Sequence, residues 1–190
     1  MLLLCAAVFI SYIDRTNISV AAIAMKDDLG WTETQKGVVL SAFFVGYLLL
    51  MAVTGALANR YGGWLVLGVA VLWWSAWTAL TPPAAMMSFG ALIAARIALG
   101  LGEAAVFPAS MNMISRWVPP ERRSRATALI ISAISLGTVF ALPATGWLVR
   151  EFGWALPFYL FGAMGLVWYA AWHFLARGDV PASASAPPPQ

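Results

Sequence analysis

The chain has 190 residues, of which 62% are apolar and 10% are charged, whereas an average soluble domain has about 25% charged residues. This composition excludes most soluble folds, and six membrane-spanning helices of about 20 residues each would leave no room for a large extramembrane domain. The net charge of +3 is better explained by membrane topology than by nucleic-acid binding. The single cysteine, Cys5, excludes a disulfide or a cysteine-based metal site within one chain.

Six apolar segments follow one another along the chain, and each is long enough to cross a bilayer. They cover residues 1–24, 37–57, 64–80, 89–114, 126–148 and 156–175. Turn-forming stretches separate them at 26–36, 59–63, 82–83, 118–123 and 150–155. Neighbouring helices can accommodate prolines in lipid, so we expect the spans that contain Pro108 and Pro143 to be unbroken. The sequence therefore predicts an all-α, six-helix transmembrane bundle over residues 1–176, followed by a disordered Pro/Ala/Ser-rich cytoplasmic linker over 177–190.

The positions of the basic residues predict how the bundle is oriented. The second, fourth and final connections carry Arg60, Arg116, Arg122, Arg123, Arg125 and Arg177, whereas the other connections carry only Lys26, Lys36 and Arg150. Because Lys and Arg in short loops remain on the cytoplasmic side, we place both termini in the cytoplasm. We expect a multi-pass protein of a cell membrane, specifically a bacterial inner membrane.

The sequence contains an internal similarity at an offset of 91 residues. This shift superposes residues 55–62 on 146–153, and Ser41 on Ser132. One interpretation is chance recurrence of glycine and leucine in apolar sequence. The other is a three-plus-three repeat, whose second copy must be inverted in the membrane because three is an odd number.

Four charged residues lie several positions inside the apolar segments: Asp14 and Arg15 in the first, and Arg96 and Glu103 in the fourth. A charge at the centre of a spanning helix costs roughly 2.5–3.5 kcal/mol on insertion scales, so these residues must pair with one another or face water. Arg96 and Glu103 are seven residues apart, which places them within about 20° of each other around a helix. The four charges sum to zero, which is consistent with mutual compensation inside the bundle.

The chemistry of these side chains suggests a role for each pair. A guanidinium group is permanently charged and matches the planar geometry of a carboxylate, so Arg15 and Arg96 are suited to an anionic substrate. Asp14 and Glu103 can change protonation when an anion displaces them from an arginine. The alternative is that the four residues form two salt bridges that only fix the register of the helices.

Several stretches together resemble the anion:cation symporter branch of the major facilitator superfamily, which includes bacterial sugar-acid transporters and vesicular glutamate and sialic-acid carriers. They are YIDRTN at 12–17, SAFFVGY at 41–47, RIALGLGEAAVFPA at 96–109, WVPPER at 117–122, and FGW at 152–154 with Phe158.

The resemblance implies that the chain is the amino-terminal half of a twelve-helix transporter. Such a transporter takes up a small organic anion, a sugar acid or related carboxylate, with a proton or a sodium ion by alternating access. The resemblance assigns substrate binding to Arg15, Arg96, Tyr47 and Asn17, and proton coupling to Asp14 and Glu103. For Tyr47 and Asn17, an interhelical hydrogen bond is an equally good explanation. The partners implied are the lipid bilayer and either a carboxy-terminal six-helix half or a second copy.

The sequence departs from the family at Asn59, where an acidic residue is usual, and at Met51, Val53 and Thr54, where Gln, Pro and Gly are common. An alternative reading is therefore a non-transporting half-bundle, which is either a truncated gene product or a membrane interaction protein. An enzyme is not expected, because the only histidine is His173 and no spacing suggests a nucleophile–base pair or a metal site. Neither a cofactor nor nucleic acid is expected as a partner.

Overall fold

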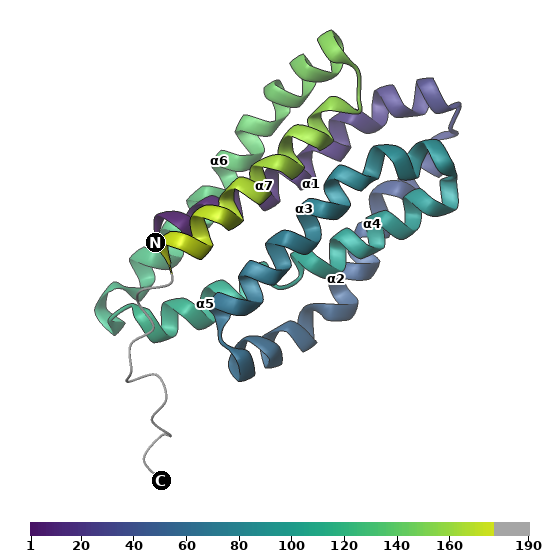
Figure 1. Ribbon diagram of the computed structural model, residues 1–190. Helices are drawn as coiled ribbons and strands as arrows, with labels where there is room; N and C mark the ends of the chain where they lie inside the picture. The colour runs from purple at the N-terminus through teal and green to yellow at the C-terminus, as the bar shows by residue number, and fades with distance from the viewer. Residues whose placement is uncertain (177–190) are drawn as a thin grey trace.

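The computed structural model describes residues 1–176, and the predicted linker at 177–190 lies outside the described residues. Within 1–176 the helices are α1 (Leu2–Leu29), α2 (Glu33–Tyr61), α3 (Gly63–Met87), α4 (Phe89–Glu103), α5 (Val106–Trp117), α6 (Pro120–Phe152) and α7 (Leu156–Leu175). In this part of the chain, six helical stretches are long and apolar enough to span a membrane, because α4 and α5 together form one span. Figure 1 shows them running back and forth along one long axis. The predicted all-α bundle of six spans is confirmed.

Several helices extend beyond the apolar segments that predicted them. The sequence predicted a connection over residues 26–36, but only Gly30 to Thr32 separate α1 from α2. Gly30 ends α1 in a left-handed conformation with a φ of 66°. The Thr32 hydroxyl accepts a hydrogen bond from Gln35 N at 3.2 Å, and Gln35 Oε1 accepts one from Thr32 N at 2.9 Å. Local capping therefore decides where these helices end, and hydropathy does not.

The predicted turn at Pro82 and Pro83 is wrong, because both residues lie inside α3. A proline within a helix removes the hydrogen bond to the carbonyl four residues earlier. Here the affected carbonyls belong to Thr78 and Ala79, and the helix continues for one more turn to its end. As predicted, α6 also continues unbroken through Pro143.

The fourth span is broken, contrary to the sequence prediction. Helix α4 ends at Glu103 and α5 begins at Val106. Pro108 cannot donate a hydrogen bond to Ala104 O, which lies four residues before it. Instead, Thr54 Oγ1 of α2 lies 3.2 Å from Ala104 O and donates to it. The interruption therefore follows Glu103 directly, in the middle of the span.

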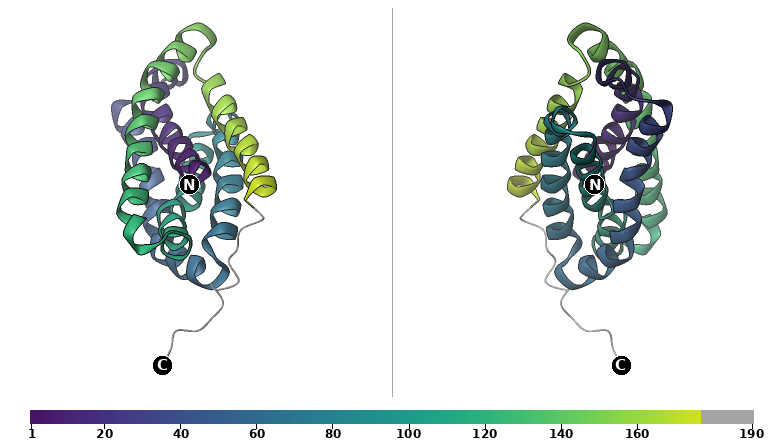
Figure 2. Two further views of the ribbon diagram at one scale, coloured as in Figure 1. Left: turned by 90° about the vertical axis from the view of Figure 1, so that its left-hand side faces the viewer. Right: turned by 90° about the vertical axis from the view of Figure 1, so that its right-hand side faces the viewer.

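The helical arrangement confirms the three-plus-three repeat. Helices α2 and α6 end at Tyr61 and Phe152, which are 91 residues apart, and the glycines that follow have φ angles of 87° at Gly62 and 86° at Gly153. Helix α1 packs most extensively against α6, and its repeat equivalent, the α4–α5 span, packs against α2 in the same way. In Figure 2, α1 (purple) lies between α6 (green) and α7 (yellow-green).

Two glycines bring the backbones of α2 and α4 into direct contact. A Cβ at Gly46 would collide with Ile97 O, and one at Gly100 would collide with Phe43 O. Small residues permit this kind of close helix crossing in membranes. The crossing fixes the part of α2 that carries Phe43 and Tyr47 against the part of α4 that carries the predicted site.

Candidate functional site

The four charged residues of the spans lie on two helices that the Arg15–Glu103 ion pair connects. Asp14 and Arg15 are near the middle of α1, and Arg96 and Glu103 are on α4. Asp14 and Arg96 are each 2% exposed and Glu103 is 0% exposed. The Arg15 side chain retains 18% of its surface. Three of the four charges are therefore enclosed by protein, and only Arg15 reaches the surface of the bundle.

Two side chains of α1 donate hydrogen bonds to the Glu103 carboxylate. Arg15 Nε lies 2.5 Å from Glu103 Oε2 and forms an ion pair with it. Ser11 Oγ, one turn earlier on α1, donates to the same oxygen at 2.8 Å. Glu103 Oε1 is buried and has no partner among residues 1–176. These bonds tie α1 to the last residue of α4, immediately before the helix is interrupted.

Aromatic rings surround the two guanidinium groups. Arg15 Cζ lies 4.6 Å from the ring centroid of Tyr47, 4.9 Å from that of Tyr12 and 5.0 Å from that of Phe43. Arg96 Cζ lies 5.4 Å from the ring centroid of Phe43, so this ring is close to both arginines. Such cation–π contacts hold the guanidinium groups in place without neutralising their charge.

Arg96 and Asp14 have opposite charges, but they are not joined. The structure shows no ion pair for either residue within the described part of the chain, and Arg96 Nε and both Asp14 carboxylate oxygens are buried without a hydrogen-bond partner. They are near enough to interact electrostatically. The register-fixing alternative predicted two salt bridges among these four residues, and within residues 1–176 they form one, between Arg15 and Glu103.

The remaining predicted site residues lie in two different places. Tyr47 stacks on Phe43, with ring centroids 5.8 Å apart, and it contacts Arg15. Asn17 is fully buried, and neither of its amide atoms has a partner among the described residues. Asn17 follows Asp14 by three residues, so it lies on the Asp14 side of α1 and not beside Tyr47.

Sequence reasoning missed three residues that the structure brings to this region: Ser11, Phe43 and Thr78. Ser11 precedes Arg15 by four residues and Phe43 precedes Tyr47 by four, so helical spacing could have placed each on the same face as its predicted neighbour. Thr78 of α3 lies beside the Asp14 carboxyl group. No signal in the sequence distinguishes this threonine from the others in the spans.

Asn59, the departure in the turn after the second span, belongs to a hydrogen-bond network between α2, α3 and α5. Asn112 Nδ2 donates to Asn59 Oδ1 at 2.8 Å, and Gly63 N donates to Asn112 Oδ1 at 3.1 Å. Arg116 Nη2 donates to Asn59 O at 3.2 Å. A neutral amide therefore holds this turn through side-chain and backbone bonds.

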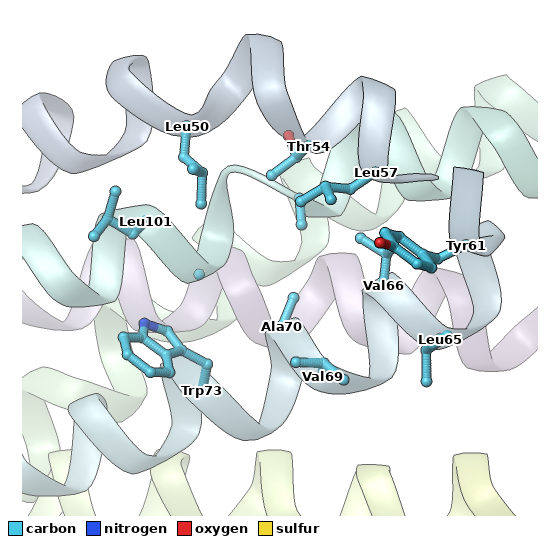
Figure 3. Close-up of a pocket in the computed structure, with 12 residues that line it drawn as sticks. Leu50, Thr54, Leu57, Tyr61, Leu65, Val66, Val69, Ala70, Trp73 and Leu101 are labelled. Atoms are coloured by element: carbon cyan, nitrogen blue, oxygen red, sulfur yellow. The ribbon is translucent and has the colours of Figure 1, made fainter. Parts of the chain in front are cut away.

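An open groove of about 530 Å³ lies among α2, α3 and the end of α4, and none of the four charged residues lines it. Figure 3 shows Leu50 and Leu57 of α2 facing Ala70 of α3 across it, with Tyr61 near one end and Trp73 near the other. Its lining is almost entirely apolar and contains no charged side chain. The groove is therefore unsuited to a small anion.

Two plant proteins are similar to this chain over most of its length. The chain is 42% identical over 166 residues to a probable anion transporter 4, chloroplastic, of Oryza sativa subsp. japonica, a match that covers 87% of this chain and 28% of the relative. It is 39% identical over 173 residues to an ascorbate transporter, chloroplastic, of Arabidopsis thaliana, which covers 90% of this chain and 32% of the relative. The chain thus spans about a third of the length of these curated relatives.

A solved structure agrees with the fold. A bacterial homologue of the human lysosomal transporter Spinster, in an inward-facing and unoccupied conformation, matches with a TM-score of 0.80 and 24% sequence identity, over 90% of this chain and 41% of that chain. The described helices therefore correspond to the amino-terminal half of a transporter of this fold. The family described as Major Facilitator Superfamily matches residues 4–190. The resemblance to anion transporters is confirmed, and the chain, a multi-pass membrane protein, belongs to the major facilitator superfamily.

Proposed function

We propose that this chain supplies half of a carrier that moves a small organic anion, a sugar acid or related carboxylate, together with a proton by alternating access. The observation that carries the proposal is the Arg96 guanidinium, which is 2% exposed and has no acidic partner in the described chain. A buried charge without a partner costs several kcal/mol. A bound carboxylate would supply the missing partner and would match the planar guanidinium with two hydrogen bonds.

Arg15 would be the second contact for the anion. Its side chain reaches the surface of the bundle, and Tyr47 and Phe43 hold it beside Arg96. Aromatic walls with a few convergent polar groups are typical of sites for small organic ligands. Asn17 lies on the other side of α1, so in this proposal Tyr47 contacts the anion and Asn17 does not. The relative that is named an ascorbate transporter supports an organic acid as the substrate class.

The coupling of anion binding to proton uptake follows from the charge balance at Glu103 and Asp14. With all four residues ionised, the site is neutral, and a monovalent anion makes its net charge −1. When the anion attracts Arg15, the Glu103 carboxylate loses its ion pair while it remains fully buried. Taking up a proton converts it to the neutral acid and restores neutrality, because burying an unpaired carboxylate is unfavourable. Asp14, which is buried without a partner, is the second group that can hold a proton.

The complete carrier needs a second six-helix half or a second copy of this chain. We propose that the bundle lies in a cell membrane with both termini in the cytoplasm. This orientation is supported by the basic residues Arg60 and Arg116, which lie at the same end of the bundle. The hydrogen bond from Arg116 to Asn59, the neighbour of Arg60, joins them there. The predicted bacterial inner membrane stays a prediction, since both plant relatives are named chloroplastic.

Anion binding can be tested on the chain itself in lipid nanodiscs. We expect glucuronate, gluconate and ascorbate to bind, and glucose, which lacks the carboxylate, not to bind. Loss of charge-assisted hydrogen bonds worth about 1.5–3 kcal/mol predicts roughly 10- to 150-fold weaker binding for Arg96→Gln. Arg150→Gln is the matched control, because Arg150 is exposed and pairs with Glu151. Equal binding of glucose and glucuronate, or unchanged binding by Arg96→Gln, would refute the proposed site.

Coupling and transport are tested in proteoliposomes. Adding the anion should cause proton uptake by the wild-type chain, and Glu103→Gln should bind the anion without taking up that proton. Concentrative uptake of labelled hexuronate driven by a pH gradient would support the carrier. Binding without proton uptake or accumulation would instead favour the non-transporting half-bundle.

A further inference from the structure

The groove among α2, α3 and the end of α4 suits an apolar ligand. Of its three polar lining side chains, Thr54 and Trp73 are already bonded. Thr54 Oγ1 donates to Ala104 O at 3.2 Å, and Trp73 Nε1 donates to Ala98 O at 2.7 Å. Along the rim, Val69 is 57% exposed. The middle of the groove therefore offers water few hydrogen-bonding groups, and an apolar ligand is favoured there.

The dimensions of the groove match those of an acyl chain. Figure 3 shows the groove running along α2 from Leu50 to Tyr61. At about 1.5 Å per residue this stretch is about 16 Å long, and half of the ~30 Å hydrocarbon core of a bilayer is about 15 Å. The volume of about 530 Å³ over this length gives a mean cross-section of about 33 Å². A helix about 10–12 Å wide needs about 80–110 Å², so a flexible chain fits within the groove and a helix does not.

Positive charge lies at the end of the groove that reaches the end of α2. Arg60 precedes Tyr61, and its Cζ atom lies 5.3 Å from the centroid of the Tyr61 ring. Arg116 Nη2 donates to Asn59 O at 3.2 Å, so a second guanidinium group lies beside this end of α2. Both arginines are exposed, and neither forms an ion pair within residues 1–176. Two uncompensated positive charges at the mouth of an apolar groove are complementary to a phosphate group that carries an acyl chain.

We propose that this groove binds one anionic phospholipid of the surrounding bilayer, such as phosphatidylglycerol. The phosphate lies between Arg60 and Arg116, and one acyl chain follows the groove until its methyl end is near Trp73 and Leu101. The lipid joins α2 to α3, which pack against α4 more extensively than against each other. The inference does not depend on the proposed function, because it requires only that the bundle spans a membrane.

Native mass spectrometry of the full chain can measure lipid binding, with phosphatidylglycerol or phosphatidylcholine that carry the same acyl chains. We expect the first phosphatidylglycerol to bind more tightly than the first phosphatidylcholine. Arg60→Gln should weaken phosphatidylglycerol binding about fivefold, equivalent to about 1 kcal/mol, and leave phosphatidylcholine binding unchanged. Arg150→Gln is the matched control, because Arg150 is exposed, pairs with Glu151 and lies at the opposite end of the bundle. Equal binding of the two lipids by the wild-type chain would overturn the proposal.

Ala70→Phe tests the groove itself. Ala70 lines the groove and is 6% exposed, so a phenyl ring there displaces several methylene groups of the acyl chain. We expect more than about tenfold weaker binding of both lipids, with circular dichroism as the check on folding. Ala163→Phe, at an exposed position of α7, is the matched control and should bind both lipids as the wild-type chain does. Wild-type lipid binding by folded Ala70→Phe would show that the lipid does not occupy the groove.

Photo-crosslinking locates the lipid on the wild-type chain, without any substitution. Phosphatidylglycerol with a diazirine at the methyl end of one acyl chain, incorporated into nanodiscs, should label peptides that contain Trp73 or Leu101. Labelling confined to α6 and α7 would refute the proposed position of the lipid. A lipid-free dimer in native mass spectrometry would assign the groove to a second copy of the chain and also overturn the proposal. Glucuronate binding by Arg60→Gln should equal that of the wild-type chain, so the lipid site and the anion site are tested separately.

Discussion

The close crossing of α2 and α4 predicts that Gly100→Ala destabilises the bundle. The new Cβ would lie 3.0 Å from Tyr47 N and 3.1 Å from Phe43 C, and it would collide with Phe43 O. All three are backbone atoms, so no change of rotamer relieves the overlap and α2 must move away. Overpacking of this kind costs up to about 3 kcal/mol, and the better helix propensity of alanine returns about 1 kcal/mol. We expect a net loss of about 2 kcal/mol.

Gly55→Ala in α2 is the matched control, because a Cβ there would meet nothing within 4 Å. It should gain about 0.5–1 kcal/mol from helix propensity alone. Reversible unfolding in mixed micelles, followed by circular dichroism, would measure both variants. Gly100→Ala should also weaken glucuronate binding, because movement of α2 takes Phe43 and Tyr47 away from the arginines. If Gly100→Ala is as stable as Gly55→Ala, the argument that this crossing holds the site together is wrong.

Two further substitutions test individual hydrogen bonds. Ser11→Ala removes the 2.8 Å hydrogen bond to Glu103 Oε2 and should lower the free energy of unfolding by about 1.5–3 kcal/mol in the same assay. Ser19→Ala, at an exposed position, is the control and should change the free energy of unfolding by less than about 0.5 kcal/mol. Equal effects of the two substitutions would contradict the buried bond. Asn112→Ala leaves the Gly63 amide without its acceptor, so hydrogen exchange at Gly63 should accelerate, and an unchanged rate would show that the Asn112 bond does not protect this turn.

Sequence reasoning predicted the fold well because hydropathy and repeat are properties of long segments. Six apolar stretches predicted the six spans, and the internal similarity at an offset of 91 residues predicted the repeat. The glycines at 62 and 153, which share a positive φ, confirm the repeat. Apart from the helix ends, which local capping sets, the sequence predictions failed at prolines. Pro82 and Pro83 do not end α3, whereas Pro108 interrupts the fourth span. What distinguishes them is the environment of the carbonyl that each proline leaves free: Thr54 reaches Ala104 O across a helix contact, which the local sequence cannot reveal.

The candidate site was harder to predict for a related reason. The cost of burying charge identified four residues, and the structure encloses three of them almost completely. Their partners depend on how α1 and α4 are placed relative to each other in the bundle, so the Arg15–Glu103 pair and the separation of Arg96 from Asp14 could not be derived from spacing. Thr78 was missed because it acts across an interface between α1 and α3, where no periodicity connects it to Asp14.

In the proposed carrier, the consecutive positions of Asp14 and Arg15 would link anion binding at Arg15 to the protonation of Asp14. Adjacent residues point about 100° apart around a helix, so the two side chains face different neighbours. Arg15 contacts Glu103, immediately before the interruption between α4 and α5, and Asp14 lies beside Thr78, whose carbonyl Pro82 leaves without a helical donor. Both neighbours lie where a helix lacks regular hydrogen bonds and bends most easily. A rotation of α1 that breaks the Arg15–Glu103 ion pair would therefore also move Asp14 relative to Thr78.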